Sequence, residues 1–170
     1  MLHKLHSYET RIAAQSKTPV FNGRLLVIDP GETCGIVYYR PTAEVTLAEF
    51  KFDSVGDFAE QLHKTMQFFV PTLIVVEDYR VYSWKAEDHA WNPLFTVRII
   101  GAIEACAALL KTKIIFQTPQ NAKGFAKDEL LQQLDIYDLT KGKRHARDAT
   151  RHLVFFLLAN RERHPKGESQ

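Results

Sequence analysis

Two periods in the pattern of hydrophobic and polar positions divide this chain into strands and helices. An uninterrupted apolar run at residues 25–28 ends in Asp29, and a second apolar run covers residues 34–39 after a short polar turn. Residues 44–52 then alternate apolar and polar side chains, as a half-buried strand does. We therefore predict three strands that form an antiparallel meander.

Helical periodicity begins after the meander. Residues 55–69 place apolar side chains three and four positions apart, Ser54 precedes them as a suitable N-cap, and Pro71 ends the pattern. The continuous apolar run at residues 73–76 predicts a strand buried on both faces, and it ends in a second acid, Glu77. Two buried strands of this chain are thus expected to end in a carboxylate.

The rest of the chain adds further αβ units. We expect a helix over residues 94–111, a strand over 113–119, one or two helical pieces over 119–137 with a break at Gly124, and a last helix over about 143–160. The order β-β-β-α-β-α-β-α-α predicts an α/β fold, in which a mixed five-stranded sheet carries helices on both faces.

A single domain accounts for this pattern. Residues 21–160 hold the predicted elements, with a lead-in segment at 1–20 and a flexible tail at 161–170. The 45% hydrophobic and 25% charged fractions are ordinary for a soluble globular protein. The net charge of +2 does not by itself indicate a nucleic-acid partner, although both ends of the chain are basic around a more acidic middle.

Location can also be predicted from composition. No run approaches the roughly 18 apolar residues that span a bilayer, and the N-terminus lacks an apolar stretch followed by a cleavage site. Cys34 and Cys106 form no CxxC pair and lie in apolar runs, so we expect two buried thiols. These features indicate a cytoplasmic protein with no membrane partner.

The acids at the strand ends are the first candidates for chemistry. If their strands are parallel neighbours, Asp29 and Glu77 emerge at the same sheet edge, where open α/β sheets bind ligands. His145 and Asp148 share a face at the start of the last helix, which can dock there. Converging carboxylates need a counter-charge, and hard oxygen ligands suit Mg²⁺ or Mn²⁺. Two such ions, about 4 Å apart, can activate water against a phosphodiester.

Each of these residues also has a simpler interpretation. Asp29 could form a turn with the Pro-Gly that follows, Asp78 could replace Glu77, and Asp148 could be an acid favoured by the helix dipole. His152, four residues after Asp148, could support the site, although a helix-surface or interface position is commoner. The three acids together are a stronger signal than any one of them.

Three short stretches carry a resemblance to a known family. In order, VIDPGETCGIVYY, LIVVEDY and HARDA resemble the opening strands, fourth strand and late His-x-x-Asp-Ala of the RuvC family of Holliday-junction resolvases. The similarity covers residues 24 to about 158, and it is greatest to small RuvC-like endonucleases of bacteriophages, which share QTP…AK and HARDA.RH. Arg147 and Arg151 flank Asp148 where bacterial members usually carry a further acid.

The resemblance implies a ribonuclease H-like fold and a metal-dependent endonuclease that resolves four-way or other branched DNA. Asp29, Glu77 and Asp148 would then be acidic ligands of Mg²⁺ or Mn²⁺, with Glu77 preferred to Asp78, and His145 would be a ligand or would position the attacking water. The products would carry 5′-phosphate and 3′-hydroxyl ends. Two symmetric cuts imply a homodimer, for which the helix from Leu94 could supply the face.

Cations and aromatic residues near these motifs could hold DNA. In the stretch after Glu77 the candidates are Arg80, Tyr82, Trp84 and Lys85, and beyond it they are Lys123, Lys141, Lys143, Arg144 and Arg147. Gln117 and Asn121 could also touch DNA, or serve the cap of the next helix. Alternatively, the tryptophans pin a long loop or meet a partner subunit, and the cations are a solvated charge run.

Other functions remain open at this point. A YqgF-like nuclease would process RNA ends, and a phage nuclease could act on forks and flaps. A non-catalytic nucleic-acid-binding scaffold could use the same fold, although the presence of all the acids argues against it. Actin-like ATPases share the strand–Asp–Gly opening, but they need two lobes, and 170 residues leave space for one.

Overall fold

The computed structural model describes residues 21–41, 45–79 and 92–159, with the side chains of 92–94 excepted. Its five-stranded sheet has the order β3-β2-β1-β4-β5. The strands are β1 (Leu25–Asp29), β2 (Thr33–Tyr39), β3 (Thr46–Lys51), β4 (Leu73–Glu77) and β5 (Lys113–Gln117). β1, β2 and β3 pair antiparallel, whereas β4 lies parallel to β1 and β5 parallel to β4. The predicted mixed sheet is confirmed.

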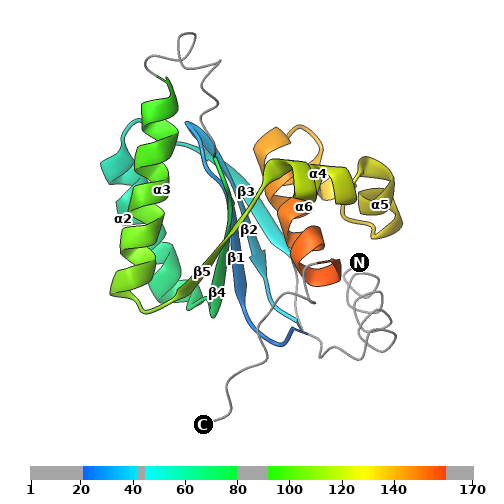
Figure 1. The fold of residues 1–170 in the computed structure, drawn as a ribbon, viewed down its shortest axis with the longest axis horizontal. Coiled ribbons are helices and arrows are strands. Elements are labelled where there is room, and N and C mark those ends of the chain that lie inside the picture. The colour runs from blue at the N-terminus through cyan, green and yellow to red at the C-terminus, as the bar shows by residue number, and fades with distance from the viewer. Residues whose placement is uncertain (1–20, 42–44, 80–91, 160–170) are drawn as a thin grey trace.

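Helices cover both faces of this sheet (Figure 1). On one face lie α2 (Val55–Phe69) and α3 (Asn92–Leu109), which pack against each other. On the other lie α4 (Pro119–Phe125), α5 (Asp128–Gln133) and α6 (Arg144–Leu158), with the 3₁₀ turn η2 (Asp138–Thr140) leading into α6. No helix within the described ranges is both long enough and apolar enough to cross a bilayer.

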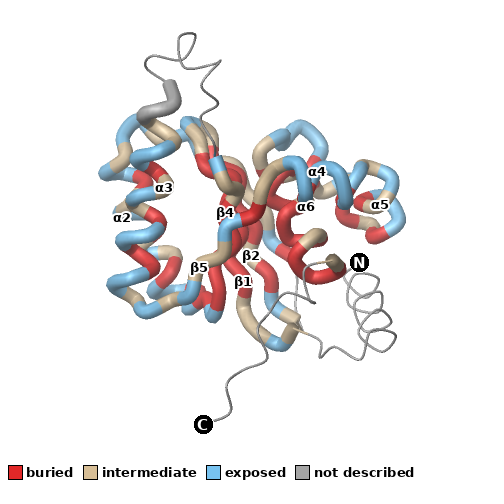
Figure 2. Tube along the Cα trace, in the orientation of Figure 1, coloured by how far each residue is buried: buried red, intermediate tan, exposed pale blue. Residues whose placement is uncertain are grey.

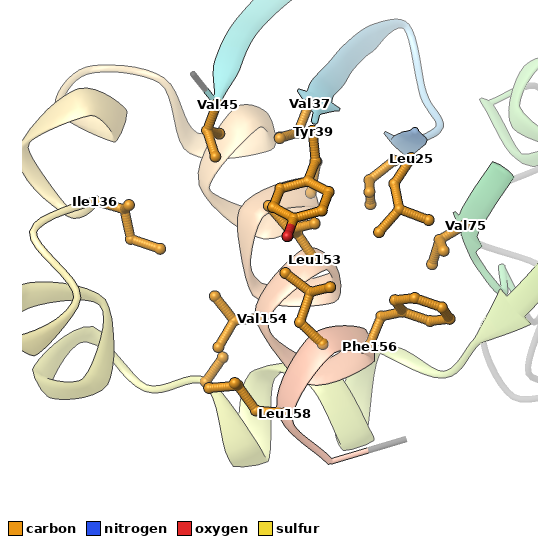
Figure 3. Packing of buried hydrophobic residues seen from close by; sticks show 14 of the residues in the cluster. Leu25, Val37, Tyr39, Val45, Val75, Ile136, Leu153, Val154, Phe156 and Leu158 are labelled. Carbon is orange, nitrogen blue, oxygen red and sulfur yellow. The ribbon is translucent and has the colours of Figure 1, made fainter. Parts of the chain in front are cut away.

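The apolar residues of each strand divide between two cores, because successive side chains point to opposite faces. Leu25 and Val27 of β1 pack toward α6, whereas Leu26 and Ile28 pack toward α2 and α3. Figure 2 shows most of β1, β4 and α6 as buried, and Figure 3 shows side chains of β1, β2 and β4 facing the apolar side chains of α6. The apolar side chains of α6 therefore form the centre of one core.

Local signals predicted most element ends well. The Ser54 side chain accepts the N–H of Asp57 at 3.0 Å and caps α2, as predicted. Gly142, with φ of 72°, adopts the left-handed conformation that favours glycine just before α6. Both cysteines are buried, also as predicted.

The predicted break at Gly124 is wrong. Gly124 lies inside α4 with an exposed position, and the helix ends at Phe125. The break comes at Ala126, which is fully buried, since its side chain packs into the α6-facing core. A solvent-facing glycine costs a helix only about 1 kcal/mol, which tertiary packing readily offsets.

Candidate active site

A single row of residues crosses the sheet near the carboxyl ends of β1, β4 and β5. Glu49 lies opposite Gly35, Gly35 opposite Asp29, and Glu77 opposite Gln117. The last pair of the parallel β1–β4 register, Ile28 and Val76, directly precedes Asp29 and Glu77, so these two acids lie side by side. The condition for their convergence, that β1 and β4 be parallel neighbours, is met.

This row faces α6. Asp29 and Glu77 have the same alternation as Val27 and Val75, whose side chains belong to the α6-facing core. Gly35 permits a close approach, because a Cβ there would lie 2.0 Å from the carbonyl oxygen of His145. The first turn of α6 therefore rests directly on the acid row.

Asp29 is buried beneath this helix, with 6% of its surface exposed. Its Oδ2 lies 2.9 Å from His145 Nδ1. Burial, and then the charge of Glu77, raise the pKa of Asp29 to about 7, although His145 acts in the opposite direction. Asp29 ends β1 and its carboxylate contacts a helix residue 116 positions away, a contact that a turn role alone does not explain.

Lys123 of α4 lies between the other two acids. Its Nζ is 3.0 Å from Asp148 Oδ2 and 3.5 Å from Glu77 Oε2. Burial lowers the pKa of Lys123, but Glu77 and Asp148 outweigh it and raise that pKa above its usual value. The other oxygen of Asp148, Oδ1, lies 2.5 Å from Arg151. The sequence predicted Lys123 only as a DNA contact and gave Arg151 no role.

His152 completes the cluster from the inside. It is 0% exposed, and its Nε2 lies 2.9 Å from Glu77 Oε2 while its Nδ1 lies 3.0 Å from Gln117 Oε1. The surface or interface position expected for His152 is wrong, because this face of α6 is turned toward the sheet. Gln117 is 3% exposed, so the DNA contact considered for it is also contradicted.

Sequence reasoning missed one further residue, Glu49 of β3. Its Oε1 accepts the N–H of Ala146 at 3.0 Å, in the first turn of α6. The only signal in the sequence was an acid on the alternating strand at the same parity as Leu47. Nothing local could show that this face of the strand meets a helix about a hundred residues later.

The DNA-contact candidates are only partly described. Arg80, Tyr82, Trp84 and Lys85 lie outside the described residues. Lys141 pairs with Asp138 at 2.9 Å, and Lys143 and Arg144 are exposed at the start of α6. The Arg147 guanidinium lies 4.7 Å from the centroid of the Tyr137 ring, which holds it against the protein.

The donor types of this cluster fit a hard divalent cation. Three carboxylates and one imidazole approach one edge of the sheet, and repulsion from Glu77 contributes to the raised pKa of Asp29. No three His, Cys, Asp or Glu side chains among the described residues form a ready cation cage. Lys123 supplies the counter-charge there, and a cation between Glu77 and Asp148 would have to displace its ammonium.

Comparison with known proteins finds similarity only at the level of structure. No family model and no curated protein matches the sequence. RuvC of T. thermophilus, solved in complex with Holliday junction substrate, matches with a TM-score of 0.60 at 17% identity, over 81% of this chain and 95% of that one. The chain has the fold of RuvC.

A second resolvase supports the same conclusion. The yeast mitochondrial Holliday junction resolvase Ydc2 matches with a TM-score of 0.59 at 15% identity, over 88% of this chain and 84% of that one. The ribonuclease H-like fold predicted from the motifs is therefore confirmed, and with it the resemblance to RuvC in architecture. At these low identities the structural matches show the fold of this chain alone.

Proposed function

We propose that this protein is a metal-dependent endonuclease that cuts four-way DNA junctions. The observation that supports it best is the gathering of Asp29, Glu77, His145 and Asp148 from three separate elements at one sheet edge. The RuvC fold adds support, since T. thermophilus RuvC was solved with a Holliday junction substrate.

In this proposal Asp29, Glu77 and Asp148 hold one or two Mg²⁺ or Mn²⁺ ions. His145 is a further ligand, or it is the group that orients water. The bound cations supply charge neutralisation and activation of water for attack on a phosphodiester. The side chain of His145 is 39% exposed, so it reaches both Asp29 and solvent. Water attacks in line, leaving 5′-phosphate and 3′-hydroxyl ends.

Cations of the protein position the DNA in this scheme. Lys143 and Arg144 are exposed beside the site at the N-terminus of α6, where backbone N–H groups also favour phosphate. Lys123, once displaced from the acids, would be free to contact the same phosphodiester backbone. The further contacts proposed are Lys141 and Arg147 here, and Arg80, Tyr82, Trp84 and Lys85 outside the described residues.

Symmetric cutting of a four-way junction needs two active sites, so we include a two-fold homodimer in the proposal. The face of α3 that points away from the sheet exposes Val97, Gly101, Ala105, Ala108 and Leu109. Among the described side chains of α3, only Arg98 and Glu104 place charge on that face. A surface of this kind can pack against its own copy.

The proposal is tested with a labelled synthetic four-way junction beside linear duplex, fork and RNA substrates, in Mg²⁺ and in a chelator. Asp148→Asn removes one proposed ligand. Asp138→Asn is the matched control, because Asp138 is an exposed acid of η2 that pairs only with Lys141 among the ion pairs of the described residues.

We expect paired nicks in the junction with wild type and Asp138→Asn, and none with Asp148→Asn or without Mg²⁺. Binding without cutting in Mg²⁺ and in Mn²⁺ would contradict the proposal and favour a DNA-binding scaffold. Preferential cutting of RNA would favour a YqgF-like activity instead. Equal cutting of forks would keep the metal site and widen the substrate class.

A further inference from the structure

We propose that His152 and Gln117 act together as a buried pair that positions Glu77 for cation binding. The inference rests on the proposed function, because Glu77 is one of the ligands assigned there. It adds two positioning residues behind that ligand, neither of which would touch the cation or the DNA.

The first observation is the burial of the pair. His152 is 0% exposed and Gln117 is 3% exposed, so neither side chain can exchange its hydrogen bonds for water. Gln117 lies opposite Glu77 in the parallel β4–β5 register, and His152 reaches both from α6. The imidazole thus bridges two neighbouring strands.

The second step is an inference about the imidazole protons, drawn from the partners of the two ring nitrogens. An ionised Glu77 carboxylate only accepts hydrogen bonds, so His152 Nε2, 2.9 Å away, must carry a proton and donate it. With Gln117 Oε1 facing Nδ1, the Gln117 Nε2 amide is a buried donor without a partner among the described residues. Turning the amide over lets that nitrogen donate to Nδ1. The proton on Nε2 points at Glu77 in both orientations.

The consequence concerns the geometry of Glu77. His152 engages Oε2 from the protein interior, which fixes the rotation of the carboxylate and leaves Oε1 for a cation. Lys123 contacts the same Oε2 from a partly exposed position, at 3.5 Å. A cation bound to Oε1 can therefore displace the Lys123 ammonium, whereas the hydrogen bond between buried His152 and Oε2 persists. Groups that hold a metal ligand in this way typically change metal affinity by 10–100-fold when they are removed.

Two nearly isosteric substitutions separate the two contacts of His152. His152→Gln keeps a donor near the Nε2 position and loses the Nδ1 contact. His152→Asn keeps a polar group near the Nδ1 position and loses the contact with Glu77. His63→Asn, at a half-buried position on α2 on the opposite face of the sheet, is the matched control.

The measurement is Mn²⁺ binding to the DNA-free protein by calorimetry, with thermal unfolding of each variant in chelator. We expect His152→Asn to weaken Mn²⁺ binding about 10-fold or more. His152→Gln keeps the donor to Glu77 but loses the contact with Gln117, so it should weaken Mn²⁺ binding by less than His152→Asn does, with the two variants melting at similar temperatures. In cleavage, the Mn²⁺ concentration for half-maximal rate should rise for His152→Asn, with little change in the rate at saturation.

Equal Mn²⁺ affinities for wild type, His152→Gln and His152→Asn would overturn the inference and reduce His152 to a packing residue. If His152→Asn does not fold, Gln117→Leu replaces it, because leucine fills a buried site without a polar atom. Weaker Mn²⁺ binding by that variant supports the pair, and wild-type affinity overturns it. Failure of the wild-type protein to bind Mn²⁺ at all would instead contradict the proposed function.

Discussion

At the scale of single residues, the chemistry of this protein depends on where the chain buries its charges. Asp29 is an ordinary aspartate in sequence, yet burial and Glu77 raise its pKa to about 7. Glu77 and Asp148 raise the pKa of Lys123, which favours its charged form. A bound cation can therefore change the charge of this site, because it favours the ionised form of Asp29 and displaces the Lys123 ammonium.

Asp29→Asn should stabilise the metal-free protein at alkaline pH. The folded-state pKa lies above the unfolded value of 3.8, so the contribution of Asp29 to stability is complete below about pH 4 and is lost as pH rises through about 7. Asparagine removes this titration. We expect a gain on the order of 2 to 4 kcal/mol at pH 8, no difference near pH 4, and loss of cleavage. Denaturant unfolding in chelator measures the gain, and equal stabilities at pH 8 would refute it.

Gly35→Ala should destabilise the fold and disrupt the site. The added Cβ would meet the backbone of His145, which cannot move aside without shifting α6. Overpacking of this kind costs about 2 to 3 kcal/mol. Gly124→Ala is the control, because nothing lies within 4 Å of its Cβ position, and it should be neutral or stabilising by up to about 1 kcal/mol. Thermal unfolding and junction cleavage of both variants check the pair.

At the scale of elements, α6 carries the site and its first turn needs anchoring. Lys143, its N-cap, makes no side-chain capping hydrogen bond, and Glu49 supplies an acceptor from β3 instead. His145 and Asp148 reach the acid row from this anchored turn. Glu49 lies far from α6 in the sequence, which explains why no local capping motif predicted this contact.

Glu49→Ala should loosen the start of α6. Removing an acceptor for an N-terminal N–H costs about 1 kcal/mol, and cleavage should fall further because His145 loses its fixed position. Glu60→Ala removes an exposed acid that pairs with Lys64 on α2, and we expect at most about 0.5 kcal/mol from it. Chemical unfolding of both variants gives the comparison. Equal effects would mean that the contact between Glu49 and Ala146 has no special weight.

At the scale of the whole molecule, the two faces of the sheet have different tasks. The face under α6 gathers the acids, whereas the described side chains on the outer surface of α3 carry charge only at Arg98 and Glu104, which leaves that surface available for a second copy in the proposed dimer. In Figure 1 the two surfaces lie on opposite sides of the sheet, so dimerisation there would leave both sites open to DNA.

Val97→Glu should separate the dimer without damaging the site. Val97 is exposed on α3, and two glutamates at a two-fold interface would repel each other while losing solvent. We expect a monomer in sedimentation analysis, together with single, unpaired nicks in the junction. Lys64→Glu, a charge change at an exposed position of α2, should leave the mass of the dimer and the paired nicking unchanged. A Val97→Glu protein that still sediments as the wild type would rule out this face.

The sequence by itself determined the element order, the strand ends at Asp29 and Glu77, and the shared helical face of His145 and Asp148, because periodicity and spacing are local properties of a chain. Only the tertiary structure decided that β1 lies beside β4 and that α6 crosses the acid row. It also decided that Lys123, His152 and Glu49 belong to the cluster. Those relations depend on packing between residues far apart in sequence, which no local pattern encodes.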